Sequence, residues 1–230
     1  MMRTVDKAGT DIAQNVTKKR SQLSSIWFRF KKNKLAMLGL ALLVIIVFFA
    51  VVAGVFADYE EDCVFQNMSE RLLFYSKGHP LGTDQYGRDL FARIIFGARI
   101  SVAMSVSTVL ISMILGSILG AVAAYFGGIV DSVIMRIADV FLAIPQMLMA
   151  VTIVSALGSS IFNLGVALTI SMVAPFSRIV RSAVLQVKGM EYIEAAKAYG
   201  SKDVRIIFLH ILPNAVGPII VQATLNMANS

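Results

Sequence analysis

Few residues in this 230-residue chain could carry out chemistry, since it contains one cysteine and two histidines. Cys63, His79, Asp84 and Asp89 occur in one segment, but their spacing matches no pattern of metal ligands. His210 lies far along the chain from His79, so the two histidines predict no catalytic pair. The sequence also lacks the G-x-x-x-x-G-K-S/T loop that cradles nucleotide phosphates. We therefore predict a chain that is not an enzyme, with no catalytic residue, no metal site and no cofactor of its own.

A second polar stretch is residues 191–214, where charged side chains recur every three or four residues among alanines. Residues 190–199 predict a short helix whose apolar side consists of Met190, Ile193 and Tyr199. Gly200 stands where a glycine commonly ends a helix, and Ser201 can cap a second helix that Pro213 ends. Such an amphipathic segment suits a groove on a partner protein or the membrane surface, and the pattern alone leaves both open.

The composition indicates that the chain with these polar residues is a membrane protein. Hydrophobic residues make up 57% of the chain and charged residues 15%, against about 25% charged residues in soluble domains. The single Cys63 excludes an intramolecular disulfide. We expect an all-α fold, a polytopic bundle of membrane helices.

Five membrane spans are predicted from the uncharged runs, because a span needs about 20 apolar residues. The first is residues 35–57, and the second lies within residues 100–130 and ends near Phe126. Residues 140–177 are uncharged over 38 positions, about 57 Å of helix, so this run must fold back. The turn is expected at residues 156–160, which gives spans three and four. A fifth span is expected from about Asn214 to the end of the sequence.

The charge distribution predicts the orientation, because positively charged flanks stay in the cytoplasm. The tail of residues 1–34 has a net charge of +7 and residues 178–210 one of +3, so both are expected inside. Residues 58–99 carry an excess of acids and are expected to form an external loop. Residues 127–139 are expected to be a second internal loop. Topology and contact with the lipid bilayer account for the basic tail, so we predict no nucleic-acid partner.

Two motifs resemble one family of transport proteins. "EYIEAAKAYGSKDVRIIFLHILPN", residues 191–214, resembles the EAA loop of bacterial ABC-importer permeases, with Glu194-Ala195-Ala196, then Gly200, then Leu212-Pro213. "HPLGTDQYGRDLFARIIFGARISV", residues 79–102, is similar to a motif that precedes the second span in the peptide/nickel branch, in particular its DppC/OppC-like subunits. The resemblance covers nearly the whole chain from about Ser25.

The resemblance implies a type I ABC-importer transmembrane domain over residues 100–230, in the bacterial cytoplasmic (inner) membrane. Residues 187–213 would couple to ATPase subunits. The coupling residues would be Glu191, Glu194, Ala195, Ala196, Gly200, Leu212 and Pro213, and the external motif Gly82, Thr83, Asp84, Gly87, Arg88 and Asp89. The family has six spans, so five imply a chain shortened at its C-terminus.

The resemblance also implies the partners and the cargo. A second homologous permease would complete the pathway, and two cytoplasmic ATPase subunits would bind ATP and Mg. An extracytoplasmic solute-binding protein would deliver di- or oligopeptides. Nickel or another small solute is the alternative cargo for the same architecture. A stand-alone channel or secondary transporter is the alternative of another class, but it predicts ionisable residues in mid-membrane, and we see none well inside the spans.

Smaller features of the spans give further predictions. Ser112, Gly116, Gly120 and Ala124 repeat every four residues, which favours close helix packing within the bundle over a subunit interface. Gln146, next to a proline in span three, is a candidate for the translocation path. Two ion pairs are expected within single helices: Arg136 with Asp139, and Asp89 with Arg93, the latter on a short amphipathic helix of the external loop.

Overall fold

A computed structural model describes residues 27–28 and 30–229, so most of the predicted basic tail lies outside the described residues. The chain divides into two compact units, Met1–Ala98 and Arg99–Ser230. The boundary falls inside one long helix, α4.

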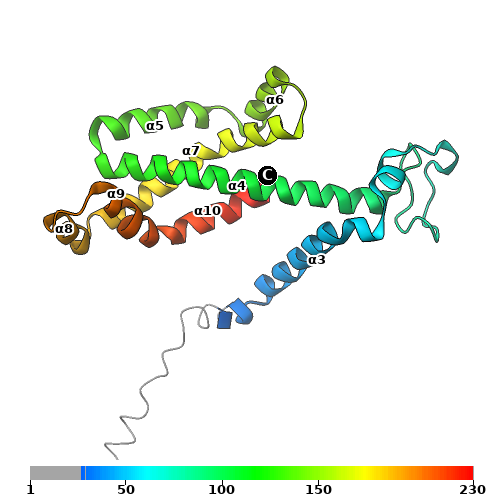
Figure 1. Ribbon diagram of the computed structural model, residues 1–230, viewed down its shortest axis with the longest axis horizontal. Helices are drawn as coiled ribbons and strands as arrows, with labels where there is room; N and C mark the ends of the chain where they lie inside the picture. The colour runs from blue at the N-terminus through cyan, green and yellow to red at the C-terminus, as the bar shows by residue number, and fades with distance from the viewer. Residues whose placement is uncertain (1–26, 29, 230) are drawn as a thin grey trace, which may run out of the picture. The chain divides into compact units, whose positions relative to one another are not determined.

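The described residues are mostly helical (Figure 1). In chain order the elements are α3 (Lys34–Phe56), a π-helical turn η1 (Tyr59–Val64), a 3₁₀ turn η2 (Met68–Glu70), α4 (Leu90–Phe126), α5 (Gly128–Ala143), α6 (Gln146–Leu157), α7 (Ile161–Lys188), α8 (Glu191–Ala198), α9 (Asp203–Arg205), a π-helical segment η3 (Ile206–Ile211), a 3₁₀ turn η4 (Leu212–Asn214) and α10 (Val216–Asn229).

Three of the helices, α3, α4 and α7, are long and apolar enough to cross a membrane. Two bent pairs add one span each if each pair counts as a broken span. They are α5 with α6, bent by 88°, and residues 203–214 with α10, bent by 66°. The all-α polytopic fold is therefore confirmed, with three to five spans against the predicted five.

Two predicted connecting segments contain helix. No separate amphipathic helix precedes span two, because α4 begins at Leu90 and continues unbroken to Phe126. Its 37 residues make about 55 Å of helix, so its polar first turns can extend beyond a hydrocarbon core of about 30 Å. Residues 128–143 form the helix α5, and the cytoplasmic position expected for residues 127–139 stays a prediction. The charged residues of α5 alternate with apolar ones in sequence, and the helix places the two kinds on different faces.

Helix α4 lies beside α7 (Figure 1), and the small residues of α4 allow the close approach. A Cβ atom on Gly116 would lie 2.4 Å from Phe176 Cβ, and one on Gly120 would lie 2.4 Å from the Ser177 carbonyl oxygen. Ser112 and Ala124 are fully buried on the same stripe. The prediction of close packing within the bundle is confirmed.

The buried hydroxyl groups of these two helices are satisfied within their own helix. Thr108 and Ser112 on α4 donate to carbonyl oxygens of Met104 and Thr108, at 2.8 and 2.7 Å. On α7, Ser177 donates to the Val173 carbonyl at 2.8 Å. These hydroxyl groups therefore add no hydrogen bond between the two helices.

The predicted turn between spans three and four lies at residues 158–160. Gly158 has φ +96° and ends α6, and Ser160 caps α7 by accepting a hydrogen bond from the Asn163 N–H. The helix before the turn is broken at Pro145, where α5 and α6 meet at 88°. Span three is therefore bent rather than straight, because proline cannot donate the hydrogen bond that would continue α5.

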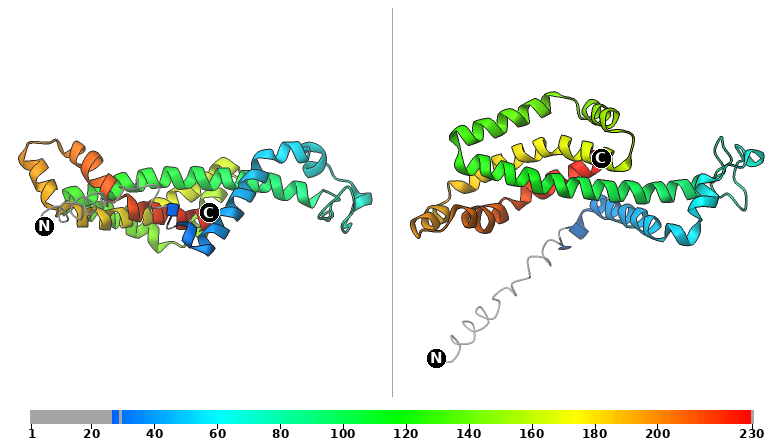
Figure 2. Two further views of the ribbon diagram at one scale, coloured as in Figure 1. Left: turned by 90° about the horizontal axis from the view of Figure 1, so that it is seen from below. Right: turned by 45° about the horizontal axis from the view of Figure 1, so that its top comes forward.

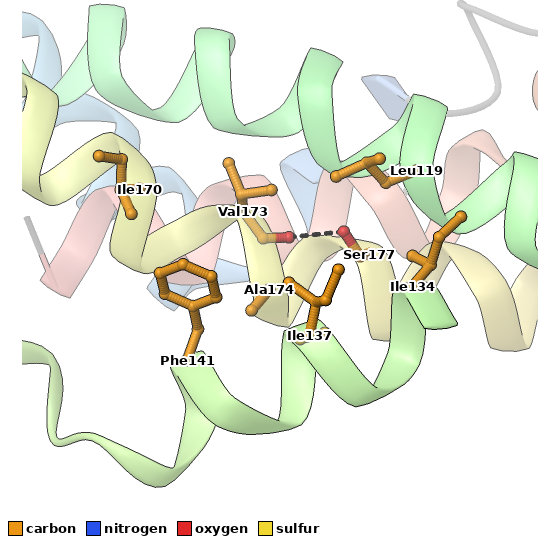
Figure 3. Close-up of a pocket in the computed structure, with 9 residues that line it drawn as sticks. Leu119, Ile134, Ile137, Phe141, Ile170, Val173, Ala174 and Ser177 are labelled. Atoms are coloured by element: carbon orange, nitrogen blue, oxygen red, sulfur yellow. Dashed lines mark hydrogen bonds between the residues drawn. The ribbon is translucent and has the colours of Figure 1, made fainter. Parts of the chain in front are cut away.

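Helices α4, α5 and α7 enclose an apolar cavity of about 230 Å³ (Figure 3). Ile134, Ile137 and Phe141 of α5 approach it from one side, and Val173 and Ala174 of α7 from another. This cavity marks the apolar side of the contact between α5 and α7.

Candidate functional site

The candidate site is the segment from α8 to η4, which lies at one end of the bundle beside the ends of α4 and α7 (Figure 2). Ile193 of α8 is fully buried in a core with Tyr125 of α4 and Val184 of α7. Ile206 and Ile211, after the turn, join the same core. The segment is thus anchored to two long helices by apolar side chains.

The outer face of α8 is polar and small. Glu191, Glu194, Ala195 and Lys197 are exposed, whereas Ala196 packs against the core. The predicted apolar side is only partly correct, because Met190 is 47% exposed and Tyr199 is 90% exposed. Ile193 and, three residues later, Ala196 therefore hold α8 against the core.

The turn after α8 depends on glycine, as predicted. Gly200 has φ +75°, a left-handed conformation that residues with a Cβ rarely adopt. Ser201 is not the cap of the next helix, because Lys202 holds that position and makes no side-chain cap bond. The second helix is also not a single α-helix, since three α-helical residues are followed by the π-helical η3 and the 3₁₀ turn η4.

The end of the segment is close to the predicted Leu-Pro stop. Pro213 occupies the first turn of η4 and is exposed, while Leu212 packs against the core. The next helix, α10, begins at Val216, two residues later than expected. The bend of 66° between residues 203–214 and α10 sets the direction in which the chain continues.

Polar contacts around Tyr125, a residue that the sequence analysis missed, connect the segment to the bundle. Its hydroxyl donates to Asp203 Oδ1 at 2.5 Å, and the Lys197 ammonium lies 5.1 Å from its ring centroid. Lys188 of α7 donates to the carbonyl oxygens of Ala124 and Tyr125, at 3.1 and 2.7 Å. The lysine therefore neutralises carbonyl groups at the end of α4, where the helix dipole is negative. The sequence signal that could have pointed to Tyr125 is its position at the end of span two, two residues before the Gly127-Gly128 pair.

The motif at residues 82–89, which the charge distribution predicts to be external, is a hydrogen-bonded loop. Asp84 accepts hydrogen bonds from the Arg88 side chain and from the Tyr86 and Arg88 N–H groups, and it pairs with Arg93. Burial alone would raise the pKa of Asp84, but these hydrogen bonds outweigh it and lower the pKa to about 2. Thr83 is buried and its hydroxyl donates to the Glu70 carbonyl.

Two glycines of the motif are required by close backbone contacts. A Cβ on Gly82 would lie 2.4 Å from the Leu73 carbonyl oxygen, and one on Gly87 would lie 1.8 Å from that of Asn67. Asp89 caps α4 by accepting from the Ala92 N–H at 2.7 Å and also contacts His79 Nδ1 at 2.8 Å. The predicted Asp89–Arg93 side-chain pair is wrong, because both partners are engaged elsewhere.

Charged groups between α5 and α7 overturn one further expectation. Asp139 pairs with Arg178 of α7 at 2.5 Å and not with Arg136. Arg181 makes a two-pronged contact with Asp131, with both distances 2.5 Å. These ionisable residues lie on α7 and on the bent pair of α5 and α6, which are candidate spans by length and composition. That no ionisable residue lies in mid-membrane stays a prediction. The paired residues are 39 and 50 residues apart, which no local pattern would show.

The remaining predictions concern Gln146 and metals. Gln146 is the first residue of α6, immediately after the bend, and is exposed. Its place in the translocation path stays a prediction. Within the described residues, no group of three or more His, Cys, Asp or Glu side chains is arranged to hold a metal ion.

Comparison with known proteins identifies the family. Residues 112–230 match the family described as binding-protein-dependent transport system inner membrane component, and residues 21–74 match the N-terminal TM domain of oligopeptide transport permease C. The chain belongs to this family of inner-membrane transport components. It is therefore a multi-pass protein of the bacterial inner membrane, and the predicted class, a transport permease rather than an enzyme, is confirmed.

Similar proteins carry peptide-transport names. The chain is 44% identical to the dipeptide transport system permease protein DppC of Alkalihalophilus pseudofirmus over 88% of this chain and 66% of that protein. It is 38% identical to the oligopeptide transport system permease protein OppC of Bacillus subtilis, over 94% and 70%. The DppC protein of B. subtilis is 42% identical, over 91% and 66%. The chain thus spans about two thirds of the length of these relatives.

Proposed function

We propose that this chain is one of two permease subunits of an ABC importer for di- or oligopeptides. Family membership and the names of relatives that are 38–44% identical support this cargo. A second homologous permease would complete the pathway, and an extracytoplasmic binding protein would deliver the peptide. ATP and Mg would be bound by two cytoplasmic ATPase subunits, and the N-terminus of this chain would be cytoplasmic.

The segment of residues 187–213 is the proposed coupling element. The supporting observation is the division of α8 into a buried anchor, Ile193, and an exposed face that carries Glu191 and Glu194. A carboxylate on an exposed, slender helix can form a charge-assisted contact with a cation of the ATPase. Movement of α8 would reach α4 and α7 through the core that they share with it. Gly200, Leu212 and Pro213 would set the shape of the segment.

The test uses the importer assembled with its partner permease, ATPases and binding protein. Glu194→Lys reverses the exposed charge, and Gly200→Val strains the turn at φ +75°. Glu61→Lys and Gly78→Val are matched controls in the external loop, where Glu61 is exposed and a Cβ on Gly78 would meet nothing within 4 Å. The measurements are co-purification of the ATPase subunits and ATP hydrolysis stimulated by binding protein.

We expect both coupling variants to reach the membrane but to lose ATPase association or stimulation at least tenfold, while the two controls behave as the unmodified importer. Normal association and normal stimulation in both coupling variants would contradict the proposed role of this segment. The peptide cargo is tested separately, by uptake of a labelled dipeptide into vesicles in competition with nickel.

A further inference from the structure

A polar cleft lies between α5 and α7, and none of the proposed coupling residues lines it. It has a volume of about 440 Å³ and is lined by Asp131, Ser132, Met135, Arg136, Asp139, Arg178 and Arg181. The apolar cavity of Figure 3 lies between the same two helices but has a different lining. The contact between α5 and α7 therefore has one polar and one apolar side.

The charges of this cleft do not cancel. Arg181 is paired with Asp131 and Arg178 with Asp139, which neutralises both carboxylates. Arg136 also lines the cleft and is exposed, and within the described residues its side chain makes no ion pair or hydrogen bond. The cleft thus presents one uncompensated guanidinium between two neutralised pairs.

The position of Arg136 argues against a cleft that faces lipid, because a charged side chain in hydrocarbon costs free energy. Arg136 is eight residues into α5, about 12 Å along the helix from Gly128, and its helix belongs to a candidate broken span. Neighbouring α5 side chains are apolar and exposed, with Val133 at 52% and Val140 at 60%. Charged side chains at such depth face protein or a water-filled path rather than hydrocarbon.

We propose that this cleft lines the translocation path and that Arg136 receives the C-terminal carboxylate of the passing peptide. The proposal rests on the proposed function as a peptide importer. A guanidinium matches a carboxylate with two parallel hydrogen bonds. Every unmodified peptide carries that carboxylate whatever its side chains are, so one arginine serves a path that accepts many sequences. A lipid phosphate has similar chemistry and is separated from the peptide by the test.

The first experiment measures peptide delivered per ATP hydrolysed by the reconstituted importer. Arg136→Gln is compared with Arg136→Lys, and with Lys77→Gln, which removes an exposed cation of the external loop. A dipeptide and its C-terminal amide are supplied at saturation of the binding protein, whose affinity for each is measured separately. We expect Arg136→Gln to lower delivery of the free acid about tenfold and of the amide less than twofold, with stimulated ATP hydrolysis retained. Arg136→Lys should be intermediate and Lys77→Gln normal.

Equal losses for acid and amide, or no loss, would overturn the role of Arg136. A defect seen only in vesicles with anionic lipid, and equal for both peptides, would assign Arg136 to a lipid phosphate and overturn the proposal. A failure of the proposed coupling segment would instead lower stimulated ATP hydrolysis, so measuring hydrolysis in the Arg136 variants distinguishes the two proposals.

A second experiment tests the path itself in a Cys63→Ser background. Ser132→Cys places a thiol in the cleft, and Val133→Cys places one on the adjacent position outside its lining. We expect a charged, water-soluble thiol reagent to label position 132 at least tenfold faster than position 133. Equal slow labelling at both positions would mean that the cleft is dry and is not part of the path.

Discussion

The Tyr125 hydroxyl donates a hydrogen bond to Asp203 Oδ1 at 2.5 Å, and it joins the last turn of α4 to the first turn after Gly200. Tyr125 is 6% exposed, so this contact lies at the edge of the core that holds Ile193. Residues 78 positions apart in sequence are thereby connected at the end of the bundle. The contact supplies a polar link between the proposed coupling segment and a membrane helix.

Tyr125→Phe should loosen this link without emptying the core, because only the hydroxyl is removed. A hydrogen bond to a charged group contributes about 1.5–3 kcal/mol. We expect faster amide hydrogen exchange in residues 203–212 and fewer peptides transported per ATP, with ATPase association retained. Tyr75→Phe is the matched control, since Tyr75 is 80% exposed in the loop that precedes α4. Unchanged hydrogen exchange and unchanged transport would show that the Tyr125 hydroxyl does not transmit movement between the segment and α4.

Gly120→Val should prevent the close approach of α4 and α7. Its Cβ would lie 2.4 Å from the Ser177 carbonyl oxygen, a backbone atom that cannot move aside. Overpacking of this kind costs about 1–3 kcal/mol or more, so we expect a lower melting temperature in detergent and less protein in the membrane. Gly39→Val on α3 is the control, because a Cβ atom on Gly39 would meet nothing within 4 Å. Equal melting of the two variants would refute the close contact between α4 and α7.

Arg181→Asp should destabilise the α5–α7 contact by about 2–4 kcal/mol, because it leaves Asp131 facing another carboxylate. The double variant Asp131→Arg with Arg181→Asp restores opposite charges and should recover most of the loss. Thermal unfolding of the purified subunit measures both. Arg205→Asp, which changes an exposed residue, should have little effect. A double variant no more stable than the single one would contradict a direct pair.

The loop that contains Asp84 should resist mild acid because of the hydrogen bonds that Asp84 accepts. Its pKa is lowered from 3.8 to about 2, so the ionised carboxylate stabilises the folded loop. That contribution is complete above about pH 5 and is lost as the pH falls through 4 towards 2. Asp84→Asn should remove it, with a loss on the order of 2 kcal/mol for the charge-assisted hydrogen bonds. Limited proteolysis of the loop between pH 3 and 7 measures this. If the Asp84→Asn loop is cleaved no faster than the unmodified loop at pH 7, the stabilising role of the Asp84 carboxylate is contradicted.

The sequence alone predicted those parts of the fold that depend on local signals. Long uncharged runs indicated the apolar helices, and Gly158 and Gly200 marked turns that do have positive φ. The stripe that contains Gly116 indicated close packing, because small residues at every fourth position allow two helix backbones to approach each other on that face.

Features that depend on distant residues could not be predicted. Arg178 and Arg181 find carboxylates on another helix, and a rule for neighbours on one helix assigned Asp139 to Arg136 instead. The helix that begins at Leu90 continues through the expected boundary, since helix formation does not end where the bilayer does. In the proposed coupling segment, Ile206 and Ile211 pack in the core while residues 206–211 form a π-helix, which local propensity does not favour.

The self-satisfied hydroxyl groups of α4 and α7 have a mechanical consequence. Thr108, Ser112 and Ser177 each bond a carbonyl of their own helix, so sliding one helix past the other breaks none of these bonds. Polar contacts that do join different helices include those of Lys188 with the end of α4, and of Arg178 and Arg181 with α5. Hydrogen bonds therefore do not hinder sliding at Thr108, Ser112 and Ser177, whereas the bond of Lys188 holds the ends of α4 and α7 that lie beside α8.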